Sequence, residues 1–535
     1  MTTCAQSLVR LLEGYGVDTV FGIPGVHTVE LYRGLHGSRL RHVSPRHEQG
    51  AGFMADGYAR ASGKPGVCFI ITGPGMTNIL TAMGQAYADS VPMLVISTVN
   101  RREHLHLGHG HLHELPDQRA MVAGVCAFSH TLQSPAQLPE ILARAFALFK
   151  CARPRPVHIE IPLDVLEMPA VDLNLMPRSL PGAPVPAGDS LAAALALLDA
   201  AHRPLILAGG GARGCAQVLQ QLAERLQAPV ALTTNARGLL PQAHPLLLDG
   251  VQSAAHGRAL IDEADVVLAV GTELGETDYD FFGLGPLRFK GSLIRLDIDP
   301  LQVMGVQRAH VGLLGDARQG LQALLDQVAP QGARGRWAVD SVQRVNQAER
   351  ASWSARQRGL QGLLDLLRDN LDAPILVGDS TQPVYQGACG YQAPAPASWF
   401  NAGSGYGTLG YGLPAAMGAK LARPERPVVA LVGDGGLQFT SGELIAACEA
   451  QIGVILLVWN NQCYGEIRDY MHARDIQPLG VDILTPDFQA LAASCHVAYH
   501  QAASPAQLQE LLASLAGTRQ PVMIEVDAGA YLALE

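Results

Sequence analysis

The sequence lacks paired cysteines, long apolar runs and an excess of basic residues. Nine cysteines are scattered over 535 residues without a single C-x-x-C pair, which argues against a disulfide framework or a zinc site. No apolar run is long enough to span a membrane, and no secretory signal is recognisable at the start. We therefore expect a cytoplasmic protein with reduced cysteines and no membrane partner.

Charged residues are also scarce. They make up 16% of the chain, whereas 48% of its residues are hydrophobic, and the formal net charge is −10. This acidic balance argues against nucleic acid or an anionic membrane surface as a partner. A chain of this length and apolar content exceeds what one core accommodates, so three domains are the natural expectation.

Short apolar runs alternate with helical segments along most of the chain. Examples are residues 67–71, 93–97, 204–208, 266–270 and 454–459. Such alternation indicates parallel sheets with helices on both faces. The predicted fold class is α/β, with three doubly wound parallel-sheet domains at residues 1–175, 189–335 and 370–535. A segment rich in proline and glycine at 177–188 separates the first two domains.

The most informative stretch combines two strand ends. The apolar run 427–432 leads into Gly433-Asp434-Gly435-Gly436, and the run 454–459 leads into Asn460-Asn461. Asp434 and Asn461 are separated by about one strand–helix–strand crossover, so both should lie at the carboxyl ends of neighbouring parallel strands. A carboxylate and an amide oxygen there suit Mg²⁺ that also binds a diphosphate. An ordinary strand-end turn is the alternative for Gly-Asp-Gly alone.

The complete pattern resembles the cofactor-binding motif of the superfamily of thiamine diphosphate-dependent 2-oxo acid decarboxylases and acetohydroxyacid synthases. The resemblance implies that Asp434, Asn461 and the backbone carbonyl of Cys463 bind Mg²⁺. In this family a bulky residue at the position of Leu409 wedges under the cofactor, and the carbonyl of Gly407 accepts a hydrogen bond from its 4′-amino group. The further cofactor-binding residues that the resemblance implies are Ser380, Thr381, Gln382, Gly433, Gly435 and Gly436.

Residues 46–60, which read RHEQGAGFMADGYAR, look like the family segment that carries the cofactor-activating glutamate, here Glu48. A carboxylic acid hydrogen-bonded to N1′ of the cofactor favours the imino tautomer. That tautomer removes the weakly acidic C2 proton within the same molecule, at high effective molarity. Glu48 is therefore a predicted catalytic and cofactor-binding residue. The alternative is an exposed glutamate before a helix, which is the commoner place for this residue type.

Five histidines occupy the loop 101–118, at positions 104, 106, 109, 111 and 113. A histidine-rich loop can bind metal, but the spacing lacks a closed ligand set. Acetohydroxyacid synthases carry Phe-Gln-Glu where this chain has Leu112-His113-Glu114, and the difference disfavours acetolactate synthesis. His113 is a candidate for binding the substrate carboxylate or for proton transfer, and solvated loop histidines are the alternative for the others.

The segment after Asn461 predicts the nature of the substrate. Glu466 and Asp469 are three residues apart and so share one helix face, in a helix that lines the substrate pocket of relatives. Two carboxylates suit a guanidinium, although a solvated charged face is the alternative. Val26 and His27 complete the predicted substrate residues.

Segments 22–25, 46–60 and 112–118 are most similar to 5-guanidino-2-oxopentanoate (2-ketoarginine) decarboxylases. The resemblance implies thiamine diphosphate- and Mg²⁺-dependent decarboxylation of a small 2-oxo acid to an aldehyde and CO₂. The alternatives are a carboligase that makes acetolactate and an FAD-dependent 2-oxo acid oxidase.

The remaining predictions concern the middle domain and the assembly. Residues 209–213 follow a strand and could hold a nucleotide phosphate, but they lack the G-x-G-x-x-G pattern. Related enzymes place FAD, ADP or nothing there; we expect nothing, with FAD as the lesser alternative. One cofactor must touch both Glu48 in the first domain and Asp434 in the third. We therefore expect a homodimer or homotetramer with sites at subunit interfaces.

Overall fold

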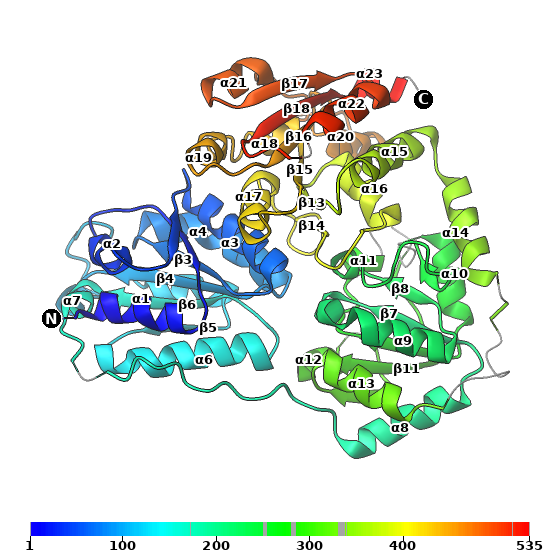
Figure 1. Cartoon of the computed structure of the whole chain (residues 1–535), viewed down its shortest axis with the longest axis horizontal. Helices are drawn as coiled ribbons and strands as arrows, with labels where there is room; N and C mark the ends of the chain where they lie inside the picture. The colour runs from blue at the N-terminus through cyan, green and yellow to red at the C-terminus, as the bar shows by residue number, and fades with distance from the viewer. Residues whose placement is uncertain are drawn as a thin grey trace.

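The computed structural model describes residues 2–171, 173–249, 254–279, 285–305, 307–329, 337–338, 340–515 and 517–533. Within these ranges the chain forms three six-stranded parallel sheets with helices between their strands (Figure 1). This confirms the predicted fold class. The predicted domain end at residue 335 and the chain ends at residues 1 and 535 lie outside the described residues. None of the described helices is long and apolar enough to cross a membrane.

The first sheet has the strand order β2-β1-β3-β4-β6-β5. Its central strands are mostly apolar and are buried along their whole length, as in sheets covered by helices on both faces. The strands are β1 (Thr19–Gly22), β2 (Arg41–Val43), β3 (Gly66–Ile70), β4 (Met93–Val99), β5 (Phe128–Thr131) and β6 (Val157–Pro162). The helices around them include α1 (Cys4–Gly14), α2 (Val29–Leu35), α3 (Glu48–Ser62), α4 (Pro74–Ala88), α5 (Gln118–Val122), α6 (Leu138–Cys151) and α7 (Leu163–Glu167).

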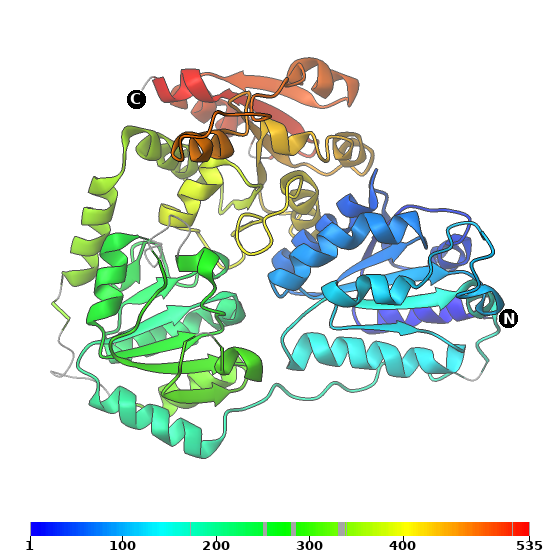
Figure 2. The same cartoon turned by 180° about the vertical axis from the view of Figure 1, so that it is seen from behind.

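The middle sheet has a different strand order, β12-β11-β10-β7-β8-β9. Residues 173–187 form an extended connection to it from the first domain (Figure 2). Its strands are β7 (Pro204–Ala208), β8 (Val230–Leu232), β9 (Leu247–Leu248), β10 (Val266–Val270), β11 (Ser292–Asp297) and β12 (Val311–Leu314). The helices around them include α8 (Gly188–Ala200), α9 (Ala216–Leu226), α10 (Ala255–Glu263), α11 (Glu276–Tyr279), α12 (Pro300–Val303) and α13 (Ala317–Gln327).

The third sheet, β14-β13-β15-β16-β18-β17, repeats the order of the first. Two connecting helices, α14 (Ser341–Ser352) and α15 (Ala355–Asp369), precede it. Its strands are β13 (Ile375–Gly378), β14 (Trp399–Asn401), β15 (Val428–Gly433), β16 (Ile455–Asn460), β17 (Ala498–Ala502) and β18 (Val522–Asp527). The helices are α16 (Gln382–Gly390), α17 (Gly412–Ala422), α18 (Asp434–Leu437), α19 (Glu443–Glu449), α20 (Gly465–His472), α21 (Phe488–Ser494), α22 (Pro505–Leu515) and α23 (Ala528–Ala533).

Helices α3 and α17 join the first and third domains of the same chain (Figure 1). A Cβ atom added to Gly57 would lie 1.9 Å from the carbonyl oxygen of Ala415, and one added to Gly418 would lie 1.9 Å from that of Met54. Only glycine allows the two backbones to approach so closely. The small residues of segment 51–59 in α3 thus pack closely against α17 of the same chain.

Candidate active site

Asp434 and Asn461 follow adjacent strands, because Gly433 of β15 pairs with Trp459 of β16. Asp434 is 2% exposed, and nearby backbone N–H groups, among them those of Gly435, Gln462 and Asn461, favour its charged form. Its Oδ2 atom is buried and has no hydrogen-bond partner among the described residues. Burial raises the pKa of Asp434. A buried carboxylate oxygen without a partner fits a bound cation, so these residues fit Mg²⁺.

The glycines around Asp434 make a cradle that side chains would fill. A Cβ atom at Gly435 would lie 2.5 Å from the ring of Tyr464, and one at Gly436 would lie 3.2 Å from Oδ2 of Asp379. A backbone without side chains can approach a diphosphate closely. The geometry of this turn therefore fits the predicted cofactor contacts.

The predicted cofactor residues at positions 380–382 lie at the same sheet edge, because β13 pairs with β15. Thr381 is the N-cap of α16. Gln382 accepts a hydrogen bond on Oε1 from the indole of Trp459, at 3.0 Å, and its Nε2 group is a hydrogen-bond donor. Asn461 accepts a hydrogen bond on Oδ1 from the backbone N–H of Cys463, at 3.3 Å. The structure thus gathers the predicted diphosphate and metal residues at one place.

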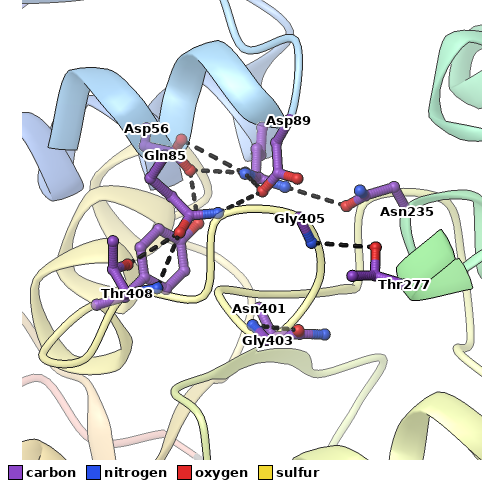
Figure 3. Close-up of polar contacts among 11 residues, drawn as sticks. Asp56, Gln85, Asp89, Asn235, Thr277, Asn401, Gly403, Gly405 and Thr408 are labelled. Carbon is purple, nitrogen blue, oxygen red and sulfur yellow. Dashed lines mark hydrogen bonds and ion pairs between the residues drawn. The ribbon is translucent and has the colours of Figure 1, made fainter. Parts of the chain in front are cut away.

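A loop between β14 and α17 carries Gly407 and Leu409, and contacts from the first domain hold it (Figure 3). Oε1 of Gln85 in α4 accepts hydrogen bonds from the backbone N–H of Thr408 at 3.3 Å and from its hydroxyl at 2.9 Å. Gly407 has a φ angle of 76°, a left-handed conformation that favours glycine. The position of both predicted cofactor contacts therefore depends on packing between domains.

The same loop region is tied to a buried ion network centred on Arg60 (Figure 3). Arg60 donates from Nε to Asp56 at 2.6 Å, from Nη2 to Asp89 at 2.5 Å and from Nη1 to Asn235 of the middle domain at 3.1 Å. Tyr411 donates its hydroxyl to Asp56 at 2.5 Å. Removing one partner from a buried, hydrogen-bonded ion network destabilises the folded protein by about 3–5 kcal/mol. This network fixes how the three domains meet.

Arg60 also borders a cavity of about 760 Å³ between the three domains. The glycine-rich segment 209–213, where we expected no bound nucleotide, lines it through Gly210, Gly211 and Arg213. The segment therefore faces a space large enough for a ligand.

Glu48 begins α3 and is half-buried. The side-chain amide of Asn78 in α4 donates a hydrogen bond to its Oε2 atom at 2.9 Å. Gly75 keeps the other carboxylate oxygen free of a neighbouring side chain, because a Cβ atom there would lie 3.3 Å from Oε1. Sequence reasoning missed Asn78 as the partner of Glu48. Asn78 follows the strand-end segment Thr72-Gly-Pro-Gly closely, and this position could have indicated that its side chain lies near the site.

The structure brings together two predicted substrate residues, His27 and His113, whose ring centroids are 5.1 Å apart. His27 is 8% exposed. Burial and then the nearby His113 lower the pKa of His27. The Nδ1 atoms of both rings are buried without a hydrogen-bond partner in the described part of the chain. Val26, beside them, is exposed.

Glu466 and Asp469 do share one face of α20, and that face holds a guanidinium of the protein itself. Arg356 of α15 lies 3.7 Å from Oε1 of Glu466 through Nη2 and 3.1 Å from Oδ2 of Asp469 through Nη1. All three side chains are about half exposed. The sequence did not predict this arginine, which comes from a connecting helix far from both acids in the chain.

Comparison with known proteins covers each of the three domains. Three family profiles match: the thiamine pyrophosphate enzyme N-terminal TPP-binding domain at residues 2–121, the central domain at 191–324 and the C-terminal TPP-binding domain at 379–526. A probable 2-ketoarginine decarboxylase of Pseudomonas aeruginosa is 51% identical over 95% of this chain and 90% of its own.

More distant relatives are acetolactate synthases. A probable acetolactate synthase large subunit of Methanocaldococcus jannaschii is 30% identical over 98% of this chain and 91% of its own. The acetolactate synthase isozyme 1 large subunit of Escherichia coli is 32% identical over 86% of this chain and 82% of its own. These matches confirm the predicted family and enzyme class. The chain belongs to the thiamine pyrophosphate enzyme family, in the group of thiamine diphosphate-dependent 2-oxo acid decarboxylases and their acetolactate synthase relatives.

Proposed function

We propose that this protein removes CO₂ from 5-guanidino-2-oxopentanoate and releases 4-guanidinobutanal. The observation that carries the choice of substrate is the acidic face of α20, where Glu466 and Asp469 surround a guanidinium group. A planar guanidinium pairs well with carboxylates, and the substrate's tail ends in the same group as Arg356. The similar protein of Pseudomonas aeruginosa, named a probable 2-ketoarginine decarboxylase, supports the same choice.

Thiamine diphosphate, when bound, supplies a nucleophilic carbon and an electron sink for the departing carboxylate. Asp434, Asn461 and the carbonyl of Cys463 would hold Mg²⁺, and the glycine cradle would face the diphosphate. Glu48 would hold a proton at the aminopyrimidine end. These assignments rest on the unpartnered Oδ2 atom of Asp434 and on the Asn78–Glu48 hydrogen bond.

The histidine pair is proposed to serve the reacting end of the substrate. Imidazole exchanges protons near neutral pH, and the two rings are close enough that a charge on one disfavours a charge on the other. We assign His113 to binding the 2-oxo acid carboxylate or to delivering the proton that completes the aldehyde, with His27 beside it.

We propose that the complete site forms between two chains of a homodimer or homotetramer. Glu48 begins α3 in the first domain, and Asp434 begins α18 in the third. One cofactor must reach both Glu48 and Asp434, so a second chain is the proposed source of one of them. Sedimentation equilibrium of the purified protein tests this, and a monomer with full activity would contradict it.

A substrate screen tests the proposed reaction. The purified protein, with thiamine diphosphate and Mg²⁺, is incubated with 5-guanidino-2-oxopentanoate, with 2-oxopentanoate and with pyruvate, and CO₂, aldehyde and acetolactate are measured. We expect the guanidino acid to be turned over best, with one aldehyde for each CO₂. Poor turnover of the guanidino acid together with rapid turnover of another acid would contradict the choice of 5-guanidino-2-oxopentanoate as the substrate. Acetolactate from pyruvate would favour the carboligase, and a yellow protein would favour a flavin.

A further inference from the structure

Glu443 connects the third domain to the residues that precede Glu48. It begins α19 and is 1% exposed. Its carboxylate accepts hydrogen bonds from the backbone N–H of Arg46, at 3.0 Å and 3.2 Å to its two oxygens, and from that of His47 at 3.1 Å. Both views show α19 beside the first domain (Figures 1 and 2). One buried carboxylate thus holds the two amides in front of the predicted activating residue.

We propose that Glu443 is a positioning residue for Glu48. By fixing the backbone at Arg46 and His47, it sets the place and direction in which Glu48 enters α3. Its side chain touches the backbone before Glu48, so it acts through Glu48 alone. The inference rests on the proposed role of Glu48 in activating the cofactor.

The surroundings of Glu443 allow it little freedom. A Cβ atom added to Gly50, in the first turn of α3, would lie 2.2 Å from Oε1 of Glu443. The carboxylate therefore lies directly against the start of the helix. Glycine at position 50 is unfavourable within a helix, but it leaves the space that Glu443 occupies.

The chemistry of the contact also favours a specific role. Burial raises the pKa of Glu443 to about 7, while the amides of Arg46 and His47 and the charge of Arg46 oppose that rise. A carboxylate offers two acceptor oxygens, whereas the amide of glutamine offers one. Glu443→Gln therefore keeps the size of the side chain and loses part of its hold on the two amides.

Glu449 provides a matched control in the same helix. It pairs with the guanidinium of Arg46 at the surface and does not hold the backbone. Glu449→Gln thus removes a contact between the same two segments, but it leaves the amides of Arg46 and His47 bonded to Glu443. The proposal expects different outcomes for these two substitutions.

Amide hydrogen exchange of the protein without cofactor gives the first test. Glu443→Gln should speed exchange in a peptide that covers residues 44–50 at least about tenfold, with little change elsewhere. Glu449→Gln should leave that peptide near the wild-type rate. Equal protection in the wild type and in Glu443→Gln would overturn the proposal, because the hydrogen bonds would then not be holding this segment.

A double-mutant cycle gives the second test, with exchange of the C2 proton of saturating bound thiamine diphosphate as the readout. A misplaced Glu48 should slow this exchange in Glu443→Gln by about ten- to a hundredfold. In a Glu48→Gln background the second substitution should add nothing, because Glu443 acts through Glu48. Additive losses would indicate a general structural role and overturn the proposal.

Two further outcomes are distinguishable. Gly50→Ala keeps Glu443 but fills its space, so it should slow C2 exchange as Glu443→Gln does, even though alanine favours the helix; a wild-type rate in this variant would contradict the proposal. If Glu48→Gln itself exchanges at the wild-type rate, the proposed function of Glu48 fails. That result differs from normal exchange in Glu443→Gln alone, which removes only the positioning role.

Discussion

Asn78 donates a hydrogen bond from its side-chain amide to the carboxylate of Glu48, with 2.9 Å between Nδ2 and Oε2. The two residues belong to the N-terminal parts of α4 and α3, which follow different strands of the first sheet. The bond leaves Oε1 beside Gly75, which has no side chain to cover it. A carboxylate held on one side and open on the other can present a proton to a bound molecule.

Glu48→Gln should therefore retain cofactor binding and lose most activity. Glutamine matches the size of glutamate but cannot take or give the proton, and general acid–base groups contribute about 10²- to 10⁴-fold to rates. Turnover and thiamine diphosphate affinity measure the two effects separately. Glu140→Gln, on the exposed face of α6, is the control and should behave like the wild type. Near-normal turnover in Glu48→Gln would show that the assignment is wrong.

Asp434→Asn should weaken the binding of both Mg²⁺ and thiamine diphosphate. The substitution replaces a charged oxygen donor by a neutral one at a buried position, and Mg²⁺ strongly prefers carboxylate oxygens. We expect the cofactor dissociation constant, measured by calorimetry, to rise at least about tenfold, and EDTA to release cofactor from the wild type. Asp475→Asn is the control, because residue 475 is exposed and has a left-handed backbone that asparagine tolerates. Unchanged, EDTA-resistant binding in Asp434→Asn would refute the metal site.

The acidic face of α20 should discriminate between substrates by their tails. Combining Glu466→Gln with Asp469→Asn should raise KM for 5-guanidino-2-oxopentanoate about fivefold or more, with little effect on 2-oxopentanoate, because exposed ion pairs are individually weak. Arg356→Gln frees both carboxylates, so it should lower KM for the guanidino acid. Equal changes in KM for 5-guanidino-2-oxopentanoate and 2-oxopentanoate would show that the substrate's guanidinium binds elsewhere.

Thr408→Val should loosen the loop that carries Gly407 and Leu409. Valine fills the same space but removes the hydroxyl that donates to buried Gln85 at 2.9 Å. A hydrogen bond lost from a buried acceptor costs about 1–3 kcal/mol, and we expect about tenfold weaker thiamine diphosphate binding. Thr277→Val removes the contact with Gly405 at the exposed end of the loop and should have the smaller effect. The reverse order of the two effects would contradict this description of the loop.

Protein stability should carry a pH dependence that belongs to Glu443. Its pKa is raised from 4.5 to about 7, so the folded protein binds this proton more tightly than the unfolded chain does. The carboxyl group's contribution to stability is then full below pH 4.5 and is lost as the pH rises to about 7. For one titrating group, the free energy of unfolding changes by at most about 1.4 kcal/mol per pH unit. Glu443→Gln should lack this loss. The urea midpoint of the variant should therefore rise relative to that of the wild type between pH 4.5 and about pH 7. A constant difference between the two midpoints over this range would contradict the raised pKa of Glu443.

The predictable part of the fold is the part that is buried on both faces. Apolar runs revealed strands such as β4, β10 and β16, which lie inside their sheets. The edge strands β5 and β17 escaped prediction because an edge strand is covered less completely and need not be apolar. In β5, which reads Phe-Ser-His-Thr, only Thr131 is fully buried.

The candidate site divides in a similar way. The spacing of Asp434 and Asn461 predicts a metal site, and the resemblance of residues 46–60 to a family segment predicts the role of Glu48. By contrast, the partners of these residues come from other elements, as Asn78 does for Glu48 and Arg356 does for Asp469. No local spacing encodes such pairs, because the packing of separate helices brings them together. Local motifs therefore predicted the candidate reacting groups but not the residues that position them.

The most direct test of the central claim is the release of CO₂ from 5-guanidino-2-oxopentanoate by the protein stripped of metal and cofactor and then resupplied. We expect no release from the stripped protein, full release after thiamine diphosphate and Mg²⁺ are both added, and 4-guanidinobutanal formed in equal amount. Release that does not depend on thiamine diphosphate, or CO₂ formed without the aldehyde, would contradict the account.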